Sequence, residues 1–522
     1  MIHQFKYGID QLSAGKALDI ANGRLQGVLT QEVAERVTAS YNHVQAIVTQ
    51  HSTVYGINTG FGPLCDTKIS EEDTRTLQYN ILQSHSVGVG NPIPVLIARV
   101  MLVTKVHALA QGYSGVALAT LERIIWHIEH NVTPVVPEKG SVGASGDLAP
   151  LSHLFLPLIG LGEVYYNDRK QPAAAVLQAE GLQPVILGPK EGLALINGTQ
   201  FILSFAVTAL QRMHNALEAA DIIGALSLEG LMGTSRPFDP RLHDIRPFPG
   251  NQLVAHRLKT MLDNSGIMAA HVDCGRVQDP YSLRCMPQVH GASRTAWLHL
   301  LELATIELNA VTDNPIIFSA EDTISGGNFH GQPLAIPLDY ATIAAAELGN
   351  ISDRRCYMMI EGRYGLPKLL IEDAGLNSGF MIPQYTTAAL VTENKTLCFP
   401  ASADSVPTSL GQEDHVSMGS ISGRKLHQVI DNLEYILAIE LLYAAQAVNF
   451  RRPLESGPIL EACHSFVRET VPFAAKDRIF AYDIQQLHKI VADQSLVNVA
   501  NNAALDNQLS LNGIYHDQFG FY

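Results

Sequence analysis

Apolar residues recur every three to four positions in the second half of the chain, which is the spacing of one face of an α-helix. Three stretches keep this spacing over long distances: residues 200–232, 294–311 and 423–450. The last begins near Gly423 and stops before Pro453, a length of about seven helical turns at 3.6 residues each. Helices that are this long and apolar on several sides pack inside a bundle.

The first half of the chain has a different pattern, because glycine and proline interrupt the apolar positions. Segments rich in these residues occur at 55–63, 86–94 and 138–150, and each predicts loops or tight turns. Alternating strand patterns are short and few. We therefore predict a mainly α fold, with a loop-rich N-terminal domain over residues 1–200 and a bundle of long helices with a C-terminal helical region over 201–522.

The composition is typical of a folded protein with large covered surfaces. Hydrophobic residues make up 47% of the 522 residues and charged residues 16%, below the charged share of about 25% that is usual in globular domains. This balance excludes a disordered chain, and the low charge indicates an oligomer with extensive interfaces. The formal net charge is −15 and no dense Lys/Arg run occurs, which disfavours nucleic acids and anionic membranes as partners.

Targeting and cysteine patterns favour a soluble cytoplasmic protein. The first residues lack a basic region followed by an apolar run, so no secretory signal is expected. No uninterrupted apolar stretch reaches the ~18 residues of a membrane-spanning helix. The six cysteines are scattered and form no Cys-x-x-Cys pair, which is typical of reduced thiols.

The most unusual segment is GSVGASGDLAP at 140–150. Its Ala144-Ser145-Gly146 tripeptide has three interpretations. One is a tight turn that caps a helix, and another is a nucleophilic serine, although the G-x-S-x-G spacing of a nucleophile elbow is missing. The third is backbone cyclisation, in which the Gly146 nitrogen attacks the Ala144 carbonyl carbon and one water leaves. Loss of a second water from Ser145 then gives a methylidene group conjugated with the ring, an electrophile that ordinary side chains do not supply.

Seven segments of the chain occur in the order that a known family shows, and they span nearly its whole length. They are YGINTGFG at 55–62, GSVGASGDLAPLSH at 140–153, LINGTQ at 195–200, VQDPYSLRC at 277–285, TDNP at 312–315, GGNFHG at 326–331 and QEDHVSMG at 412–419. On these segments the chain resembles the aromatic amino acid ammonia-lyases. The resemblance implies non-oxidative loss of ammonia from an L-amino acid, on a mainly α-helical fold that assembles as a homotetramer whose active sites take residues from three chains.

The resemblance also implies a prosthetic group and the residues that act with it. The group is a 4-methylidene-imidazol-5-one formed from the tripeptide, and the reaction requires no metal and no nucleotide. Tyr55 matches the base that removes the β-proton of the substrate, although a phenol with an ordinary pKa near 10 needs a nearby positive field for this task. Arg284 matches the group that holds the substrate carboxylate, because a guanidinium can bind both oxygens in a fixed orientation.

Further residues match positions that line the same chamber. Asn197 and Gln278 match amides that bind the prosthetic group or the polar end of the substrate without adding charge near an electrophile. Tyr281 matches a second phenol close to the group, and Phe329 matches an aromatic wall. Asn314 is equally consistent with a role in the active site and with a purely structural role.

Two positions are informative about the side chain of the substrate. His85 is polar where relatives that act on phenylalanine carry apolar residues, but relatives that act on tyrosine also have histidine there. Glu413 stands where relatives that act on tyrosine or phenylalanine have a neutral amide. A buried carboxylate needs a partner, and an imidazole N–H is a suitable one, so we expect L-histidine as the substrate and trans-urocanate and ammonia as products. Phe399 and Leu410-Gly411 depart from the residues common in relatives that act on histidine.

Other hypotheses stay open. With the same prosthetic group, the chain could be a tyrosine or phenylalanine ammonia-lyase, or a 2,3-aminomutase that returns the amine to the β-carbon. A catalytically inactive scaffold on the same fold is a further hypothesis, and it predicts that the tripeptide stays linear.

Overall fold

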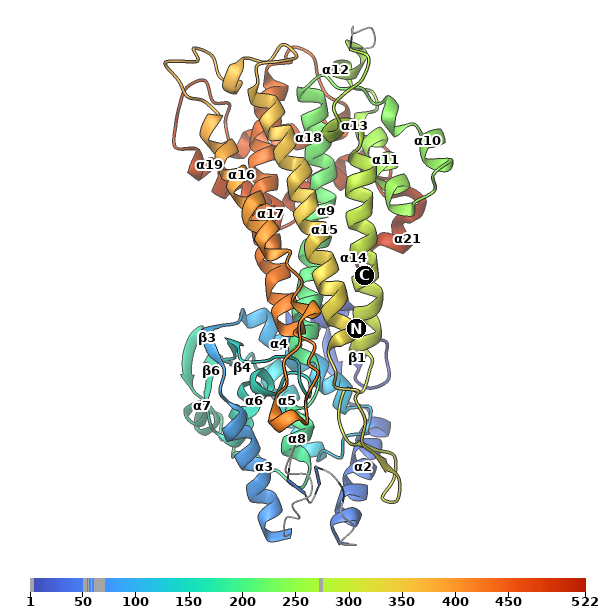
Figure 1. Cartoon of the computed structure of the whole chain (residues 1–522), viewed down its shortest axis with the longest axis vertical. Helices are drawn as coiled ribbons and strands as arrows, with labels where there is room; N and C mark the ends of the chain where they lie inside the picture. Colours follow the sequence, from blue (N-terminus) through green and yellow to red (C-terminus); the bar gives the residue numbers. More distant parts are fainter. Residues whose placement is uncertain (1–3, 50–53, 55, 58, 61–70, 272–275) are drawn as a thin grey trace.

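The computed structural model describes residues 4–49, 54, 56–57, 59–60, 71–271 and 276–522. It is mainly α-helical, which confirms the predicted fold class. Long helices form an elongated bundle, and shorter helices and small sheets from the first part of the chain gather at one end of it (Figure 1). The division into two domains at residue 200 stays a prediction, and buried apolar side chains from both parts belong to one continuous cluster.

Long helices run along the bundle. They are α9 (Gln200–Gly230), α14 (Met286–Leu308), α15 (Gln332–Ile360), α16 (Met381–Leu397) and α17 (Gly419–Asn449). Helix α17 packs against both α9 and α15, and nearly every residue of α9 is buried. Since helices that are apolar on all sides belong in the interior, the helices predicted at 200–232 and 423–450 are confirmed.

Helix α14 is longer than its apolar pattern predicts. It begins at Met286, well before the repeat at 294–311. The first turns of α14 bury two polar side chains, which are paired with the carboxylate of Asp221 in α9. The His290 ring lies 2.8 Å from this carboxylate and the Arg294 guanidinium lies 2.5 Å from it. Hydrophobic periodicity does not detect a buried face of this kind.

Shorter elements surround the end of the bundle that the N-terminal part covers. The helices are α1 (Ala14–Ala21), α2 (Gln31–Thr49), α3 (Glu71–His85), α4 (Val95–Leu109), α5 (Leu118–Glu129), α6 (Leu148–Phe155), α7 (Ala173–Ala179) and α8 (Glu191–Ile196). The strands are β1 (Gln4–Lys6), β2 (Gln26–Val28), β3 (Val89–Pro92), β4 (Thr133–Pro134), β5 (Pro137–Lys139), β6 (Glu163–Tyr166), β7 (Arg169–Pro172), β8 (Ile316–Ile317) and β9 (Thr323–Ile324). Strands β1 and β2 are parallel, whereas β3–β5, β4–β6–β7 and β8–β9 are antiparallel. Two of the glycine-rich segments also contain regular structure, since β3 lies within 86–94 and α6 begins at the end of 138–150.

The opposite end of the bundle carries a second group of short helices (Figure 1). They are α10 (Pro240–Asp244), α11 (Pro249–Leu262), α12 (Gly266–Ala269) and α13 (Tyr281–Arg284). The chain ends with α18 (Pro458–Thr470), α19 (Phe480–Ala492), α20 (Ser495–Asp506) and α21 (His516–Phe519), of which α19 packs on α17. Over the described ranges, no helix has the combined length and apolarity that crossing a membrane requires.

The first residues of α6, α9, α15 and α17 lie close together. A Cβ added to Gly331, just before α15, would lie 2.6 Å from Ile202 of α9, and one added to Gly419 of α17 would lie 2.8 Å from the same side chain. The backbone N–H of Met418 donates to the carbonyl of Val142 at 2.9 Å, next to the tripeptide. Helix N-termini carry unpaired N–H groups and a partial positive charge, so this junction suits a group that gains negative charge.

Candidate active site

The tripeptide backbone lies in the left-handed region. Ser145 has φ 51° and Gly146 has φ 74°, and a residue with a Cβ adopts such values only against a steric cost. A Cβ added to Gly146 would lie 2.0 Å from the carbonyl oxygen of Gly198, so only glycine fits there. Ala144 is buried against Val416. Close packing therefore compresses this turn.

Asp147 joins the tripeptide to the start of α9. Its backbone N–H donates to the Gly198 carbonyl at 2.8 Å. Its carboxylate accepts hydrogen bonds from the Ser141 hydroxyl at 2.9 Å and from the Ile202 backbone N–H at 3.0 Å. Burial raises the pKa of Asp147 to about 7, and these donors oppose the rise. Asp147 is therefore a buried carboxyl that holds the turn in place.

Glu413 contacts the tripeptide directly. Its Oε1 accepts a hydrogen bond from the Ser145 hydroxyl at 2.7 Å. Its Oε2 accepts hydrogen bonds from the hydroxyls of Thr408 and Ser409, each at 2.9 Å. Charge-assisted hydrogen bonds of this kind are stronger than those between neutral groups. The structure thus brings together two residues that the sequence separates by 268 positions.

His85 lies at the end of α3, within electrostatic reach of Glu413. Its Nδ1 is 3.0 Å from the Ser84 hydroxyl oxygen. Burial lowers the pKa of His85, and the negative charge of Glu413 works against that shift. The two residues expected to bind the substrate side chain therefore lie near each other.

Asn197 is buried in a cluster of charged and polar groups. Its Nδ2 donates to the Asn314 carbonyl at 2.9 Å and to the Asp313 carboxylate at 3.3 Å. The Lys105 ammonium donates to the backbone carbonyl of Asn197 at 2.6 Å, and Lys190 pairs with Asp313 at 2.6 Å. Burial lowers the pKa of Lys105 to about 7. The Oδ1 of Asn197 is buried without a hydrogen-bond partner among the described residues, so it is available as an acceptor.

Phe329 precedes α15, in a loop that touches the loop of Glu413. The rings of His330 and His415 stack with their centroids 5.6 Å apart, and His330 Nε2 lies 3.3 Å from the His415 carbonyl oxygen. Phe329 itself is half-buried. It therefore belongs to the same end of the bundle as the tripeptide.

Tyr55 lies outside the described residues, so its role as base stays a prediction. Its neighbour Gly56 is described and has φ 72°. A Cβ added to Gly56 would lie 2.4 Å from Leu193 in α8, and α8 ends directly before Asn197. Gly56 therefore lies beside the segment that leads to Asn197.

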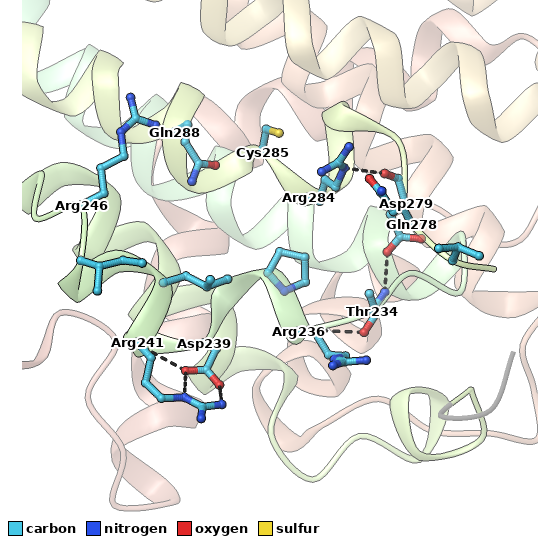
Figure 2. Close-up of a pocket in the computed structure, with 14 residues that line it drawn as sticks. Thr234, Arg236, Asp239, Arg241, Arg246, Gln278, Asp279, Arg284, Cys285 and Gln288 are labelled. Carbon is cyan, nitrogen blue, oxygen red and sulfur yellow. Dashed lines mark hydrogen bonds and ion pairs between the residues drawn. The ribbon is translucent and has the colours of Figure 1, made fainter. Parts of the chain in front are cut away.

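Two of the other predicted site residues lie in a cleft of about 1050 Å³ (Figure 2), and Tyr281 lies beside it in α13, at the opposite end of the bundle (Figure 1). Gln278 and Arg284 line this cleft. The Arg284 Nε donates to the Asp279 carbonyl at 2.9 Å, and its guanidinium carbon lies 4.6 Å from the ring centroid of Tyr281. Tyr281 is 71% exposed, so these groups face outward from their own chain.

The length of α9 separates the two groups of residues. Asn197 lies just before its first residue, and Thr234, just after its last turn, donates its backbone N–H to the Asp279 carboxylate at 2.7 Å. A helix of 31 residues spans about 46 Å at a rise of 1.5 Å per residue. Within one chain the predicted site residues therefore form two separate groups: Ser145, Asn197, His85, Phe329 and Glu413 at one end, and Gln278, Tyr281 and Arg284 at the other.

Comparisons with known proteins agree with the order of the motifs. The profile of the family described as aromatic amino acid lyase matches residues 12–469. The chain is 45% identical to the histidine ammonia-lyase of Myxococcus xanthus (strain DK1622) over 496 residues, which cover 95% of this chain and 98% of that protein. The chain belongs to the aromatic amino acid lyase family.

Solved structures of similar proteins show the same fold. The histidine ammonia-lyase from Trypanosoma cruzi has a TM-score of 0.89 at 38% identity, covering 99% of this chain and 97% of that one. The tyrosine aminomutase from Streptomyces globisporus has a TM-score of 0.91 at 34% identity, covering 96% and 99%. The shared fold therefore does not determine which reaction a member of this family catalyses.

Proposed function

We propose that the chain is a carbon–nitrogen lyase that converts L-histidine to trans-urocanate and ammonia. The observation that carries this proposal is the carboxylate of Glu413, which contacts Ser145 and lies near His85. A phenyl ring would leave this charge without a partner, whereas an imidazole N–H can donate to it. The similarity to histidine ammonia-lyases over nearly the whole chain supports the same substrate.

We further propose that the tripeptide forms a 4-methylidene-imidazol-5-one. The fit is supported by the left-handed backbone at Ser145 and Gly146 and by the carbonyl of Gly198, which leaves no room for a Cβ at Gly146. Ring closure and dehydration remove two waters and need no oxidant. Once formed, the group supplies an electrophile for the amine, which makes ammonia a better leaving group.

The residues of the chain then bind, orient and deprotonate the substrate. Glu413 accepts a hydrogen bond from the imidazole, and Asn197 Oδ1 accepts from the substrate amine. The terminal nitrogens of Arg284 have no hydrogen-bond partner within the described ranges and suit the substrate carboxylate. Tyr55 is the proposed base for the β-proton.

A complete chamber requires a second chain, because Arg284 and the tripeptide are separated by the length of α9. We propose the homotetramer with shared active sites that the resemblance implies. Large apolar side chains exposed along the bundle support it, among them Ile306 of α14, Tyr357 of α15 and Tyr385 of α16. Burial of such side chains is typical of stable subunit interfaces. The cytoplasmic location stays a prediction.

An ammonia-release assay with L-histidine, L-tyrosine and L-phenylalanine tests the proposed function. We expect urocanate and ammonia from L-histidine in equal amounts, and little turnover of the other two. Cleavage of L-tyrosine or L-phenylalanine without urocanate from L-histidine would refute it.

A 2,3-aminomutase is the second candidate function, since tyrosine aminomutase structures share the fold and His85 is compatible with tyrosine. Chiral analysis of the products identifies it. A β-amino acid among the products would show that the amine returns to the substrate.

A further inference from the structure

The loop before α17 holds the Glu413 carboxylate from one side. The hydroxyls of Thr408 and Ser409 both donate to Oε2, at 2.9 Å each. The backbone N–H of Thr408 donates to the Glu413 carbonyl at 2.8 Å, which closes the loop between these two residues. Among the described residues, the other oxygen, Oε1, accepts a hydrogen bond from the Ser145 hydroxyl alone, at 2.7 Å. The two oxygens thus have separate sets of partners.

The loop backbone adopts an unfavourable conformation in this arrangement. Ser409, Leu410 and Gly411 have successive φ values of 50°, 55° and 87°, and residues with a Cβ rarely occupy this region. Leu410 is 94% exposed, so its packing does not compensate for the strain. Backbone hydrogen bonds within the loop and the two side-chain hydrogen bonds to Oε2 both hold this bend, and strain of this kind persists where surrounding contacts fix it.

Maturation of the tripeptide changes the partners of only one oxygen. Dehydration breaks the Cβ–O bond of Ser145 and removes its Cα proton, a Cα=Cβ double bond forms, and the hydroxyl and the proton leave as water. Oε1 then loses its donor, while both hydroxyls on Oε2 remain. The carboxylate is left with one oxygen held in place and the other one free beside the new electrophile.

We propose that Thr408 and Ser409 are positioning residues that determine specificity for an imidazole side chain. By holding Oε2, they direct Oε1 of Glu413 toward the N–H of the substrate imidazole. A neutral imidazole has one N–H donor, so a fixed acceptor selects it over a phenyl ring, which has none. This inference rests on the proposed function and adds the two residues that orient the specificity group.

Binding of two substrate analogues that lack an amine, and therefore cannot be deaminated themselves, tests the inference. The analogues are 3-(imidazol-4-yl)propanoate and 3-phenylpropanoate, which differ only in the ring, and each is measured as a competitive inhibitor of L-histidine deamination. We expect Thr408→Val and Ser409→Ala each to weaken the imidazole compound about tenfold, because a hydrogen bond to a charged group is lost. The phenyl compound should change less than about twofold. Thr408→Ser restores the hydroxyl and should restore the affinity for the imidazole compound.

Controls separate this effect from a general loss of structure. Leu410→Gly removes an exposed side chain from the same bend and should leave both inhibition constants unchanged. Intact mass, lower by two waters in every variant, shows that the tripeptide has matured. If Thr408→Val does not fold, Ser409→Ala decides the question, because Ser409 is exposed. Equal weakening of both compounds, or no weakening of either, would overturn the inference, whereas a wild-type protein that forms no urocanate would overturn the proposed function instead.

Discussion

Replacing Glu413 with glutamine removes a charge from the specificity pocket while preserving the size of the side chain. The structure shows Glu413 half-buried, with donors on both carboxylate oxygens. A glutamine carbonyl can still accept one of these hydrogen bonds, but its NH₂ group cannot accept any. The variant therefore loses the charged acceptor that the imidazole N–H needs.

The size of the expected effect follows from the hydrogen bond and from its exposure. A hydrogen bond to a charged group contributes about 1.5–3 kcal/mol, and each 1.4 kcal/mol corresponds to about a factor of ten. Since Glu413 is partly exposed, solvent screening places the effect in the lower part of this range. We therefore predict that Glu413→Gln lowers kcat/KM for L-histidine by about ten- to thirtyfold.

Steady-state assays with L-histidine and with L-phenylalanine measure this effect. Residual turnover of L-phenylalanine should change less than about twofold, because a phenyl ring makes no hydrogen bond to the carboxylate. Asp414→Asn is the matched control: it removes the same charge one residue away, at an exposed side chain, and should change neither activity by more than about twofold. Equal losses on both substrates, or an equal loss in the control, would refute the assignment of Glu413 to the imidazole.

Further predictions concern ring closure, assembly and pH. Gly146→Ala places a Cβ 2.0 Å from the Gly198 carbonyl oxygen, so the variant should keep both waters in its intact mass; a mature mass would contradict this steric argument. Ser145→Ala and Arg284→Gln should each abolish urocanate release. Co-expression of the two variants should restore part of the activity, because one active site can then combine an intact Ser145 from one chain with an intact Arg284 from another. No restored activity would argue against active sites shared between chains. Burial lowers the pKa of His427 from 6.5 to about 4. Between pH 6.5 and about 4 the unfolded chain therefore binds more protons than the folded chain, so the free energy of unfolding falls as the pH drops through this window. His427→Gln should flatten this part of the curve of Tm against pH, and an unchanged slope would show that another group is responsible.

The long helices could be predicted from the sequence where their buried faces are apolar. Helices α9 and α17 follow this rule, whereas the pattern of α15 is interrupted by Pro337 and by charged residues that are fully buried. Arg355 of α15 pairs with Glu440 of α17 at 2.5 Å. Periodicity assigns such residues to the surface, because the partner that makes their burial possible is known only once the helices are packed.

The candidate site could be predicted only as a set of motifs. The contact between Ser145 and Glu413 joins distant segments, and the separation of Arg284 from both follows from the length of α9 rather than from any local signal. The position of Lys105 inside the apolar run MLVTKVHAL indicates that this lysine is buried. Because a lysine is rarely buried unless it is paired, the sequence also indicates a polar partner for its ammonium group. The structure shows its ammonium bound to the Asn197 carbonyl.

The condensation of Ala144, Ser145 and Gly146 into an electrophilic ring is tested most directly by mass. Freshly purified protein that releases urocanate is weighed intact, and the peptide that contains residues 140–150 is then weighed after proteolysis. We predict that both masses are lower than the sequence mass by two water molecules. The full sequence mass in catalytically active protein would contradict the formation of the ring.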